Sequence, residues 1–213
     1  MQCSTRVAGT YPQHIALGRQ GTVESGVMAQ PTILITGRSG FLGQAIAQAL
    51  IGRYAVIGLD MVQPKQPIHG MATIQTDLTS DASVAKTMQA VRERAGDRIT
   101  SVIHLAAYYD TTGEDNPKYG AVTVKGTLRL LEALKALRTD QFIFSSTLLV
   151  HAPSPEKGVK IDEDSPLDPA WAYPKSKLQT ERLVTMHRGS IKPVIMRFAG
   201  IYDEDCRARF IAQ

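Results

Sequence analysis

The stretch TGRSGFLG, residues 36–43, is the part of the sequence that most strongly predicts the fold. It follows the β-branched run TILIT at 32–36, which is typical of a buried parallel strand. It precedes residues 41–52, whose apolar side chains recur at helical spacing. A glycine-rich turn between a strand and a helix predicts a site where the backbone approaches a pyrophosphate, at a helix end that attracts anions.

The three glycines of this turn have separate expected roles. Gly37 permits the tight bend, Gly40 lets the backbone approach the anion, and Gly43 lets the helix pack against the strand. A turn that merely joins a strand to a helix is the alternative, and the sequence context favours the anion site. Arg38 lies inside the turn, where it either contacts phosphate or points to solvent; the sequence leaves both open.

Strands alternate with helices along the rest of the chain. The pattern predicts further strands at 54–60, 72–77, 101–107, 141–147 and 193–202, helices at 80–95, 120–138 and 173–188, and an irregular loop at 152–170. Such alternation is typical of an α/β fold with a parallel sheet and helices on both faces. The sequence therefore predicts a Rossmann-like doubly wound parallel sheet over residues 29–213.

The composition excludes several classes of protein. No apolar run reaches the roughly 18–20 residues that a membrane-spanning helix needs. The net charge of +4 is too small to indicate a nucleic-acid partner. Two cysteines, Cys3 and Cys206, form neither a zinc site nor a disulfide framework, so we expect no metal and a cytoplasmic protein. Residues 1–28 lack a secretory signal and are expected to be a disordered tail, or to precede the true start at Met28.

Two acidic residues follow predicted strands. Asp60 suits hydrogen bonds to the adenosine ribose hydroxyls and repels a 2′-phosphate, which favours NAD over NADP. An ordinary strand-ending Asp is the weaker alternative. Asp77 either reaches the adenine or caps a turn, and the sequence does not separate these.

The catalytic candidates lie near the fifth strand and the helix after it. Tyr173 and Lys177 are four apart, so they share one helix face, and a nearby ammonium should lower the pKa of the phenol. The tyrosine could then exchange a proton with a substrate oxygen during hydride transfer. The strand ends in Ser145, Ser146 and Thr147, whose hydroxyls either position that oxygen or cap the strand. A surface Tyr–Lys pair is the alternative, which the position after the fifth strand disfavours.

These motifs, with HLAA at 104–107, KGT at 125–127 and YPKSK at 173–177, closely resemble the extended short-chain dehydrogenase/reductases, the NAD-dependent epimerase/dehydratase family. The resemblance covers about 29–213 and implies an NAD cofactor. It also implies a catalytic set of Thr147, Tyr173 and Lys177, with Ser146 as a lesser candidate, and often a homodimer through the helices at 120–138 and 173–188. The resemblance also implies that Asp77 and Leu78 flank the adenine and that Leu105, Ala106 and Ala107 run under the cofactor. The other candidate cofactor contacts are Gly37, Arg38, Gly40, Phe41, Leu42, Gly43, Asp60, Tyr173 and Lys177.

Four departures from the family pattern limit this resemblance. Thr123 stands where the family usually has Asn, and Leu148 and Leu149 replace the Asp-Glu pair of sugar-nucleotide dehydratases. Ala199 and Gly200 stand near another family Asn. Family chains also continue well beyond this point, so we expect a C-terminally truncated chain with the substrate lobe largely missing.

The leading hypothesis is an NAD-dependent oxidoreductase or epimerase that acts on a hydroxyl or keto carbon of a small molecule, possibly a nucleotide sugar. A non-catalytic NAD-binding protein or an inactive truncated product is the alternative. A sterol or flavonoid reductase-like protein is a weaker one, because Asp60 disfavours NADP.

Overall fold

The computed structural model describes residues 30–202 except 65, 111, 155 and 157. It confirms the Rossmann-like parallel sheet, whose six strands lie in the order β3-β2-β1-β4-β5-β6. The order reverses between β1 and β4, and ligands of such sheets bind at this point, outside the carboxyl ends of the strands. The strands are β1 (Thr32–Thr36), β2 (Ala55–Asp60), β3 (Ala72–Gln75), β4 (Arg98–His104), β5 (Arg138–Thr147) and β6 (Lys192–Phe198).

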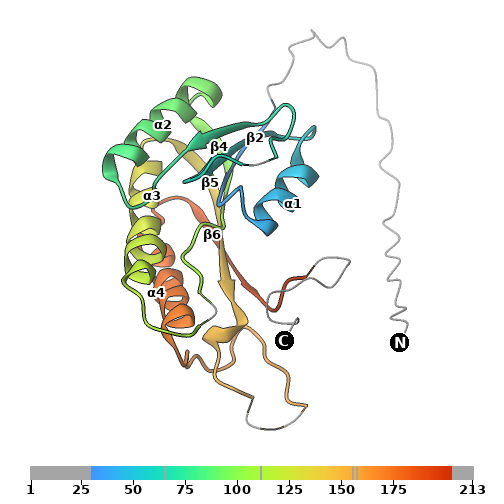
Figure 1. Ribbon diagram of the computed structural model, residues 1–213, viewed down its shortest axis with the longest axis vertical. Coiled ribbons are helices and arrows are strands. Elements are labelled where there is room, and N and C mark those ends of the chain that lie inside the picture. Colours follow the sequence, from blue (N-terminus) through green and yellow to red (C-terminus); the bar gives the residue numbers. More distant parts are fainter. Residues whose placement is uncertain (1–29, 65, 111, 155, 157, 203–213) are drawn as a thin grey trace, which may run out of the picture.

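The helices divide unequally between the two faces of the sheet (Figure 1). One face is covered by α2, α3 and α4, and the main apolar core lies beneath them. A smaller core lies under α1 on the other face. The helical segments are α1 (Phe41–Leu50), α2 (Asp81–Ala95), the π-helix η1 (Tyr119–Lys125), α3 (Gly126–Leu134), the 3₁₀ turn η2 (Leu148–Val150) and α4 (Ala172–His187).

Some predicted boundaries were wrong for identifiable reasons. We expected a strand at 101–107, but β4 ends at His104 because its neighbour β1 ends at Thr36, the residue paired with His104. The strand expected at 193–202 ends at Phe198, the partner of the last residue of β5. The single helix expected at 120–138 begins as η1, whose wider turn is marked by the hydrogen bond from the Gly126 amide to the Ala121 carbonyl, five residues back.

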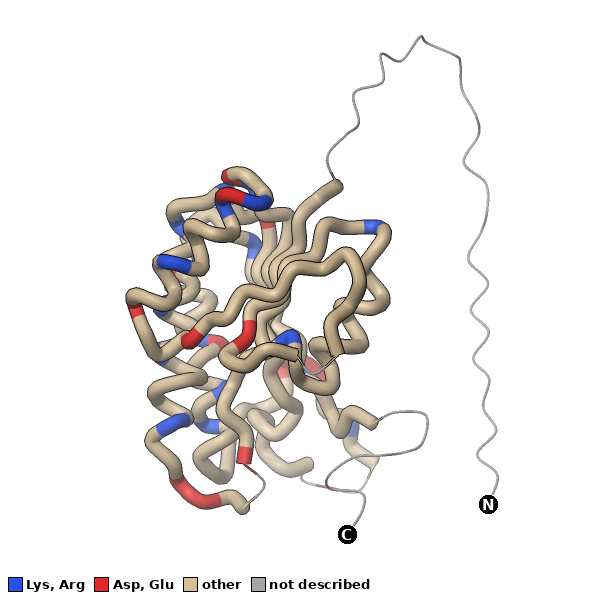
Figure 2. The backbone as a smooth tube through the Cα atoms, turned by 45° about the horizontal axis from the view of Figure 1, so that its top comes forward, with Lys and Arg blue, Asp and Glu red and all other residues tan. Residues whose placement is uncertain are grey.

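Charged residues gather on the helices and connecting loops and leave the middle of the sheet almost free of charge (Figure 2). The expectations for residues 1–28, Cys3 and Cys206 lie outside the described residues. In the part of the chain that the structure describes, every helix is too short or too polar to cross a bilayer.

Candidate functional site

The glycine-rich turn connects β1 to α1 at the carboxyl edge of the sheet. Gly37 has a φ of 69°, and a Cβ there would lie 2.8 Å from the amide nitrogen of Ala106. Gly43 is buried, and a Cβ on it would collide with the backbone of Gly37 and Arg38. Any side chain at either position would therefore push the turn away from β4 or from its own helix, which accounts for both glycines.

The N-terminus of α1 has the form expected of an anion site. Gly40 is its exposed N-cap residue, and no side chain within the described segments caps it. The first amides of a helix have no partner within the helix and need one outside. Phe41 is exposed and Leu42 is half-buried, so the first turn of α1 lies at the surface. The residues present therefore fit a pyrophosphate.

Arg38 does not point to solvent, because its side chain is completely buried. Its aliphatic part lies over Gly58 of β2, where a Cβ would be 2.7 Å from the Arg38 Cγ. The Nη2 atom donates to the Gln66 carbonyl at 3.1 Å, whereas Nε and Nη1 have no partner among residues 30–202 as described. The guanidinium thus anchors the connection between β2 and β3, and the expected phosphate contact stays a prediction.

Asp60 lies directly beside the glycine turn. Its Oδ2 accepts a hydrogen bond from the Ser39 amide at 2.7 Å, and its Oδ1 accepts one from the Val62 amide at 3.2 Å. The carboxylate therefore fastens the end of β2 to the turn and remains half-buried at its rim. This is the place where an acid could meet ribose hydroxyls next to a pyrophosphate.

The two residues expected near adenine have structural partners. Asp77 Oδ1 accepts hydrogen bonds from the Thr79 amide and hydroxyl at 2.8 and 2.7 Å, which lower the pKa of the carboxyl. Leu78 is buried in the main core and packs against Gly126. Asp77 therefore caps the turn before α2, and both adenine contacts stay predictions.

A buried hydrogen-bond chain runs beneath the loop after β4. The Thr127 hydroxyl donates to the Thr123 carbonyl, so its oxygen accepts from His104 Nε2 at 2.8 Å. His104 Nδ1 then accepts from the Thr36 hydroxyl at 2.7 Å. Burial lowers the pKa of His104 to about 3, so the ring is neutral, as this chain requires. The chain fixes the carboxyl ends of β1 and β4 to η1 and α3.

The same chain holds the loop that we expected to run under the cofactor. The Thr36 hydroxyl accepts hydrogen bonds from the amides of Leu105 and Ala106 at 3.2 and 3.1 Å. Ala107 follows and is half-buried. Thr123 Oγ1 then accepts from the Tyr108 amide at 3.0 Å. Thr123, where the family usually has Asn, thus still ties this loop to the helix.

Thr147 and Tyr173 meet at the end of β5. Thr147 is the last residue of β5, and a hydrogen bond between its side chain and Tyr173 lowers the pKa of the phenol. Burial of the phenol has the larger effect and, together with repulsion from Tyr109 and Tyr119, raises the pKa of Tyr173 to about 12. We expected Lys177 to lower this pKa. In the structure its ammonium turns to the backbone and is not among the groups that shift the phenol.

Lys177 lies on the same face of α4, as predicted, but deeper. Its Nζ donates to the Ser145 carbonyl at 2.7 Å and lies 5.9 Å from the centre of the Tyr173 ring and 4.9 Å from that of Phe144. Burial lowers the pKa of the ammonium to about 7, and Glu181 opposes this shift. Near neutral pH Lys177 is therefore a mixture of charged and neutral forms.

Ser146 points away from Thr147, because successive residues of a strand face opposite sides of the sheet. Its hydroxyl donates a short hydrogen bond to Glu181 Oε1. The same carboxylate accepts from Arg197 Nε at 3.1 Å and from Nη2 at 2.7 Å. The structure thus gives Ser146 a buried partner on α4, and its contact with a substrate stays a prediction.

Two tyrosines pack around the phenol of Tyr173. The Tyr109 ring lies edge-on to Tyr173 with ring centres 4.9 Å apart, and Tyr119 lies 6.3 Å from it. Tyr109 is 46% exposed, so it stands between Tyr173 and the solvent. These two tyrosines belong to the segment 108–119, for which the sequence predicted no role.

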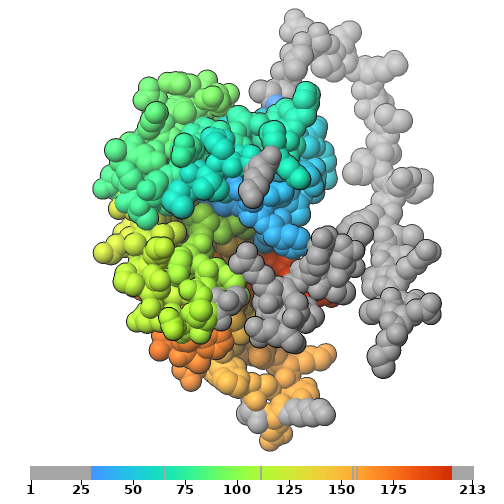
Figure 3. Space-filling model, viewed as in Figure 1, coloured from blue at the N-terminus to red at the C-terminus, as the bar shows by residue number. Residues whose placement is uncertain are grey.

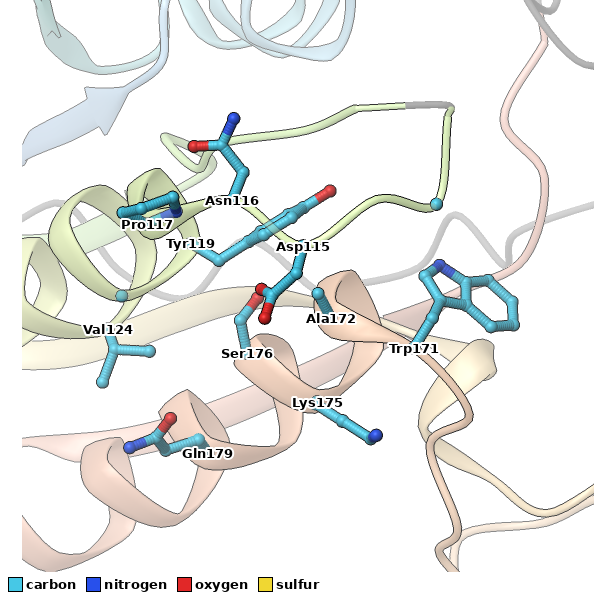
Figure 4. Close-up of a pocket in the computed structure, with 12 residues that line it drawn as sticks. Asp115, Asn116, Pro117, Tyr119, Val124, Trp171, Ala172, Lys175, Ser176 and Gln179 are labelled. Atoms are coloured by element: carbon cyan, nitrogen blue, oxygen red, sulfur yellow. The ribbon is translucent and has the colours of Figure 1, made fainter.

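A cavity of about 480 Å³ lies on another face of α4, between this segment and the helix. Figure 4 shows Asp115 and Tyr119 on one side and Lys175, Ser176 and Gln179 of α4 on the other. Tyr173 and Lys177 do not line it. The cavity is therefore separate from the edge that carries the glycine turn.

The sequence did not predict the buried polar groups next to the site, which are Glu181, Arg197 and the ring of His104. Glu181 could have been suspected, since it follows Lys177 by one helical turn. Arg197 interrupts an otherwise apolar strand, which also marks a buried charge in need of a partner.

Comparisons with known proteins identify the family of this chain. The NAD dependent epimerase/dehydratase family matches residues 33–208. A putative UDP-glucose 4-epimerase of Methanocaldococcus jannaschii is 28% identical over 179 residues, which are 81% of this chain and 56% of that protein. The uncharacterized UDP-glucose epimerase YtcB of Bacillus subtilis is 27% identical over 80% of this chain and 56% of its own length. The chain thus spans little more than half the length of the curated relatives it matches.

Solved structures show the same likeness. A short-chain dehydrogenase/reductase superfamily protein of Agrobacterium tumefaciens with bound NAD is 30% identical, with a TM-score of 0.68 over 81% of this chain and 50% of its own. The UDP-glucose 4-epimerase of Thermus thermophilus, a complex with NAD, is 26% identical, with a TM-score of 0.67 over 81% and 57%. On the match across most of its length, this chain belongs to the NAD dependent epimerase/dehydratase family.

Proposed function

We propose that this chain is the NAD-binding part of an enzyme that oxidises and reduces a hydroxyl or keto carbon of a nucleotide sugar. The observation that carries the proposal is the meeting of Thr147 and Tyr173, with Lys177 behind them, at the sheet edge that also carries the glycine turn. Cofactor binding and proton transfer would thus take place at the carboxyl ends of the strands, where ligands of such sheets bind.

The turn supports NAD as the cofactor. The amides at the start of α1 would hold the pyrophosphate, and Asp60 would accept hydrogen bonds from the adenosine ribose. The segment 105–107, fixed by Thr36, would support the middle of the cofactor. When bound, NAD would supply the hydride acceptor.

Tyr173 would exchange the proton. With its pKa raised to about 12, the phenol is protonated at neutral pH, so it is ready to donate to a carbonyl oxygen. To act as the base it must lose that proton. A cation close to the phenol oxygen would favour the loss, and Lys177, whose Nζ lies 5.9 Å from the centre of the Tyr173 ring, is a side chain that could supply one. Thr147 would hold the substrate oxygen beside the phenol.

The relatives support a nucleotide-sugar substrate, since they are named as UDP-glucose epimerases. A UDP-glucuronic acid 4-epimerase of Bacillus cereus, a complex with UDP-glucuronic acid and NAD, is 28% identical over 80% of this chain and 57% of its own. Leu148 and Leu149 follow Thr147, where an eliminating enzyme needs acids. This favours epimerisation or oxidation over dehydration.

The helices also support a homodimer. The segments η1 and α3 lie directly against α4 and form one continuous surface with it (Figure 3). Paired with its equivalent in a second copy, this surface would form a helical bundle between two sheets. Sedimentation velocity at two protein concentrations would test the dimer.

Calorimetric titration with NAD and, separately, with NADP tests the cofactor. Tight binding of NAD and much weaker binding of NADP is the expected result, and binding of neither would reject the site. Turnover of UDP-glucose and UDP-glucuronic acid then tests the enzyme. A non-catalytic NAD-binding protein is the second candidate, because the pKa of Tyr173 is raised and not lowered. NAD binding without turnover in an otherwise folded chain would favour it.

A further inference from the structure

A second polar cluster lies behind the site, between α4, β5, β6 and the loop at 151–165. Its centre is the Glu181 carboxylate, which is 5% exposed and is held by Ser146 and by two nitrogens of Arg197. Arg197 Nη1 also donates to His151 Nε2 at 3.1 Å. His151 is buried, and its Nδ1 therefore donates to the Ser165 carbonyl at 3.1 Å.

This cluster has a defined charge. His151 must be neutral to accept from Arg197, so the cluster holds one carboxylate and one guanidinium. A buried ion pair gives little net stability, because desolvation offsets its attraction. Stability alone therefore does not account for a Glu–Arg pair at this position.

The position of Glu181 relative to Lys177 suggests a role for the Glu181–Arg197 pair other than stability. The two are one turn apart on α4, and both are buried. The other titratable groups around Lys177 are His104 of β4, Tyr173 of its own helix, and Tyr109 and Tyr119 through their contacts with Tyr173. At neutral pH none of these groups is an anion, since His104 is neutral and Tyr173 keeps its proton. Glu181 is the negative charge that opposes the desolvation of Lys177.

We propose that Glu181 is a positioning residue: its carboxylate, fixed by Ser146 and Arg197, is the counter-charge that keeps an ammonium at Lys177 beside Tyr173. Arg197 fixes the direction of the carboxylate and moderates its charge. This inference rests on the proposed function, because the charge of Lys177 matters only if Tyr173 transfers protons.

The test is the titration of Lys177 itself, followed by NMR of ¹³C-labelled lysine side chains between pH 5 and 11. The Lys177→Arg variant identifies its signal. In Glu181→Gln the midpoint of Lys177 should fall by about one pH unit, because the opposite charge is lost. Glu132→Gln, which removes an exposed carboxylate on α3, should leave the midpoint where it is.

Glu181→Gln leaves Arg197 without its ion-pair partner and could unfold the chain. Arg197→Met is therefore the second variant to be tested. This variant removes the cation that offsets Glu181, and the midpoint should rise. Shifts of opposite sign in the two variants cannot come from a general loosening of the fold. An unchanged midpoint in either folded variant would overturn the proposal. The titration needs neither NAD nor turnover, so its outcome is distinguishable from a failure of the proposed function.

Discussion

The two halves of the carboxyl edge of the sheet differ in the kind of polar group that they contain. Around the glycine turn, at the ends of β1 and β2, the polar contacts are mostly backbone amides meeting fixed oxygens, as at Asp60 and Thr36. Around the end of β5 they are buried ionisable side chains, such as Lys177 and Glu181. Backbone amides do not titrate in this pH range, whereas the protonation of a buried ionisable group such as Lys177 depends on pH. Cofactor binding and proton transfer should therefore respond differently to pH and to mutation.

The largest difference between the effects on turnover and on NAD binding is expected from Tyr173→Phe. It removes the proposed proton donor and leaves the glycine turn untouched, so kcat should fall by about 10²–10⁴-fold while the Kd for NAD stays the same. Steady-state kinetics and calorimetry measure the two quantities. Tyr54→Phe, at the far end of β2, is the control. A variant that keeps its turnover would remove Tyr173 from the mechanism.

Gly37→Ala should disrupt the glycine turn, the other half of the carboxyl edge. The new Cβ meets the Ala106 amide at 2.8 Å, and the φ of 69° is itself unfavourable for alanine. We expect a loss of about 2–4 kcal/mol in the free energy of unfolding and a large loss of NAD affinity. Gly52→Ala is a matched control, because Gly52 has a φ of 87° but open space around it. Equal destabilisation in both variants would show that the close approach to Ala106 has no part in the effect.

Lys177→Met should stabilise the protein while impairing proton transfer. The folded pKa of about 7 lies below the ordinary 10.5, so the folded state pays for a buried ammonium below pH 7. As pH rises from 7 to 10.5, the unfolded chain holds the proton more often than the folded one, and this penalty disappears. Thermal melts should show a Tm higher than the native one by about 5 °C at pH 6, with the difference shrinking by pH 10. A difference that is constant across pH would contradict the assignment.

A smaller effect is expected from Asp60→Asn. The amide can still accept from the Ser39 backbone, so the fold should hold, but the repulsion of a 2′-phosphate is lost. The preference for NAD over NADP should fall by about tenfold in calorimetric titrations, which corresponds to about 1.4 kcal/mol. Asp97→Asn, an exposed carboxylate at the end of α2, serves as the control. If the preference is unchanged, another group sets cofactor choice.

Much of the fold was readable from the sequence, because glycine spacing and apolar periodicity are local signals. Strand ends were less predictable, since His104 and Phe198 end their strands only where a neighbour ends. The motif singled out Thr147, Tyr173 and Lys177, which the structure brings together, but it did not predict the pKa of Tyr173 or of Lys177. The pKa of Tyr173 depends on burial beneath Tyr109, which lies 64 positions away in the chain, and the orientation of Lys177 depends on the Ser145 carbonyl. No local pattern encodes either.

The Thr36 hydroxyl has a consequence for the dynamics of the edge. Leu105 and Ala106 lie beyond the end of β4, where backbone amides normally exchange their hydrogens with water quickly. Both are bonded to one buried oxygen, whose own proton is committed to His104. In hydrogen–deuterium exchange these two amides should persist as long as those of the central strands. The backbone at Leu105 and Ala106 would then open only when the sheet itself opens.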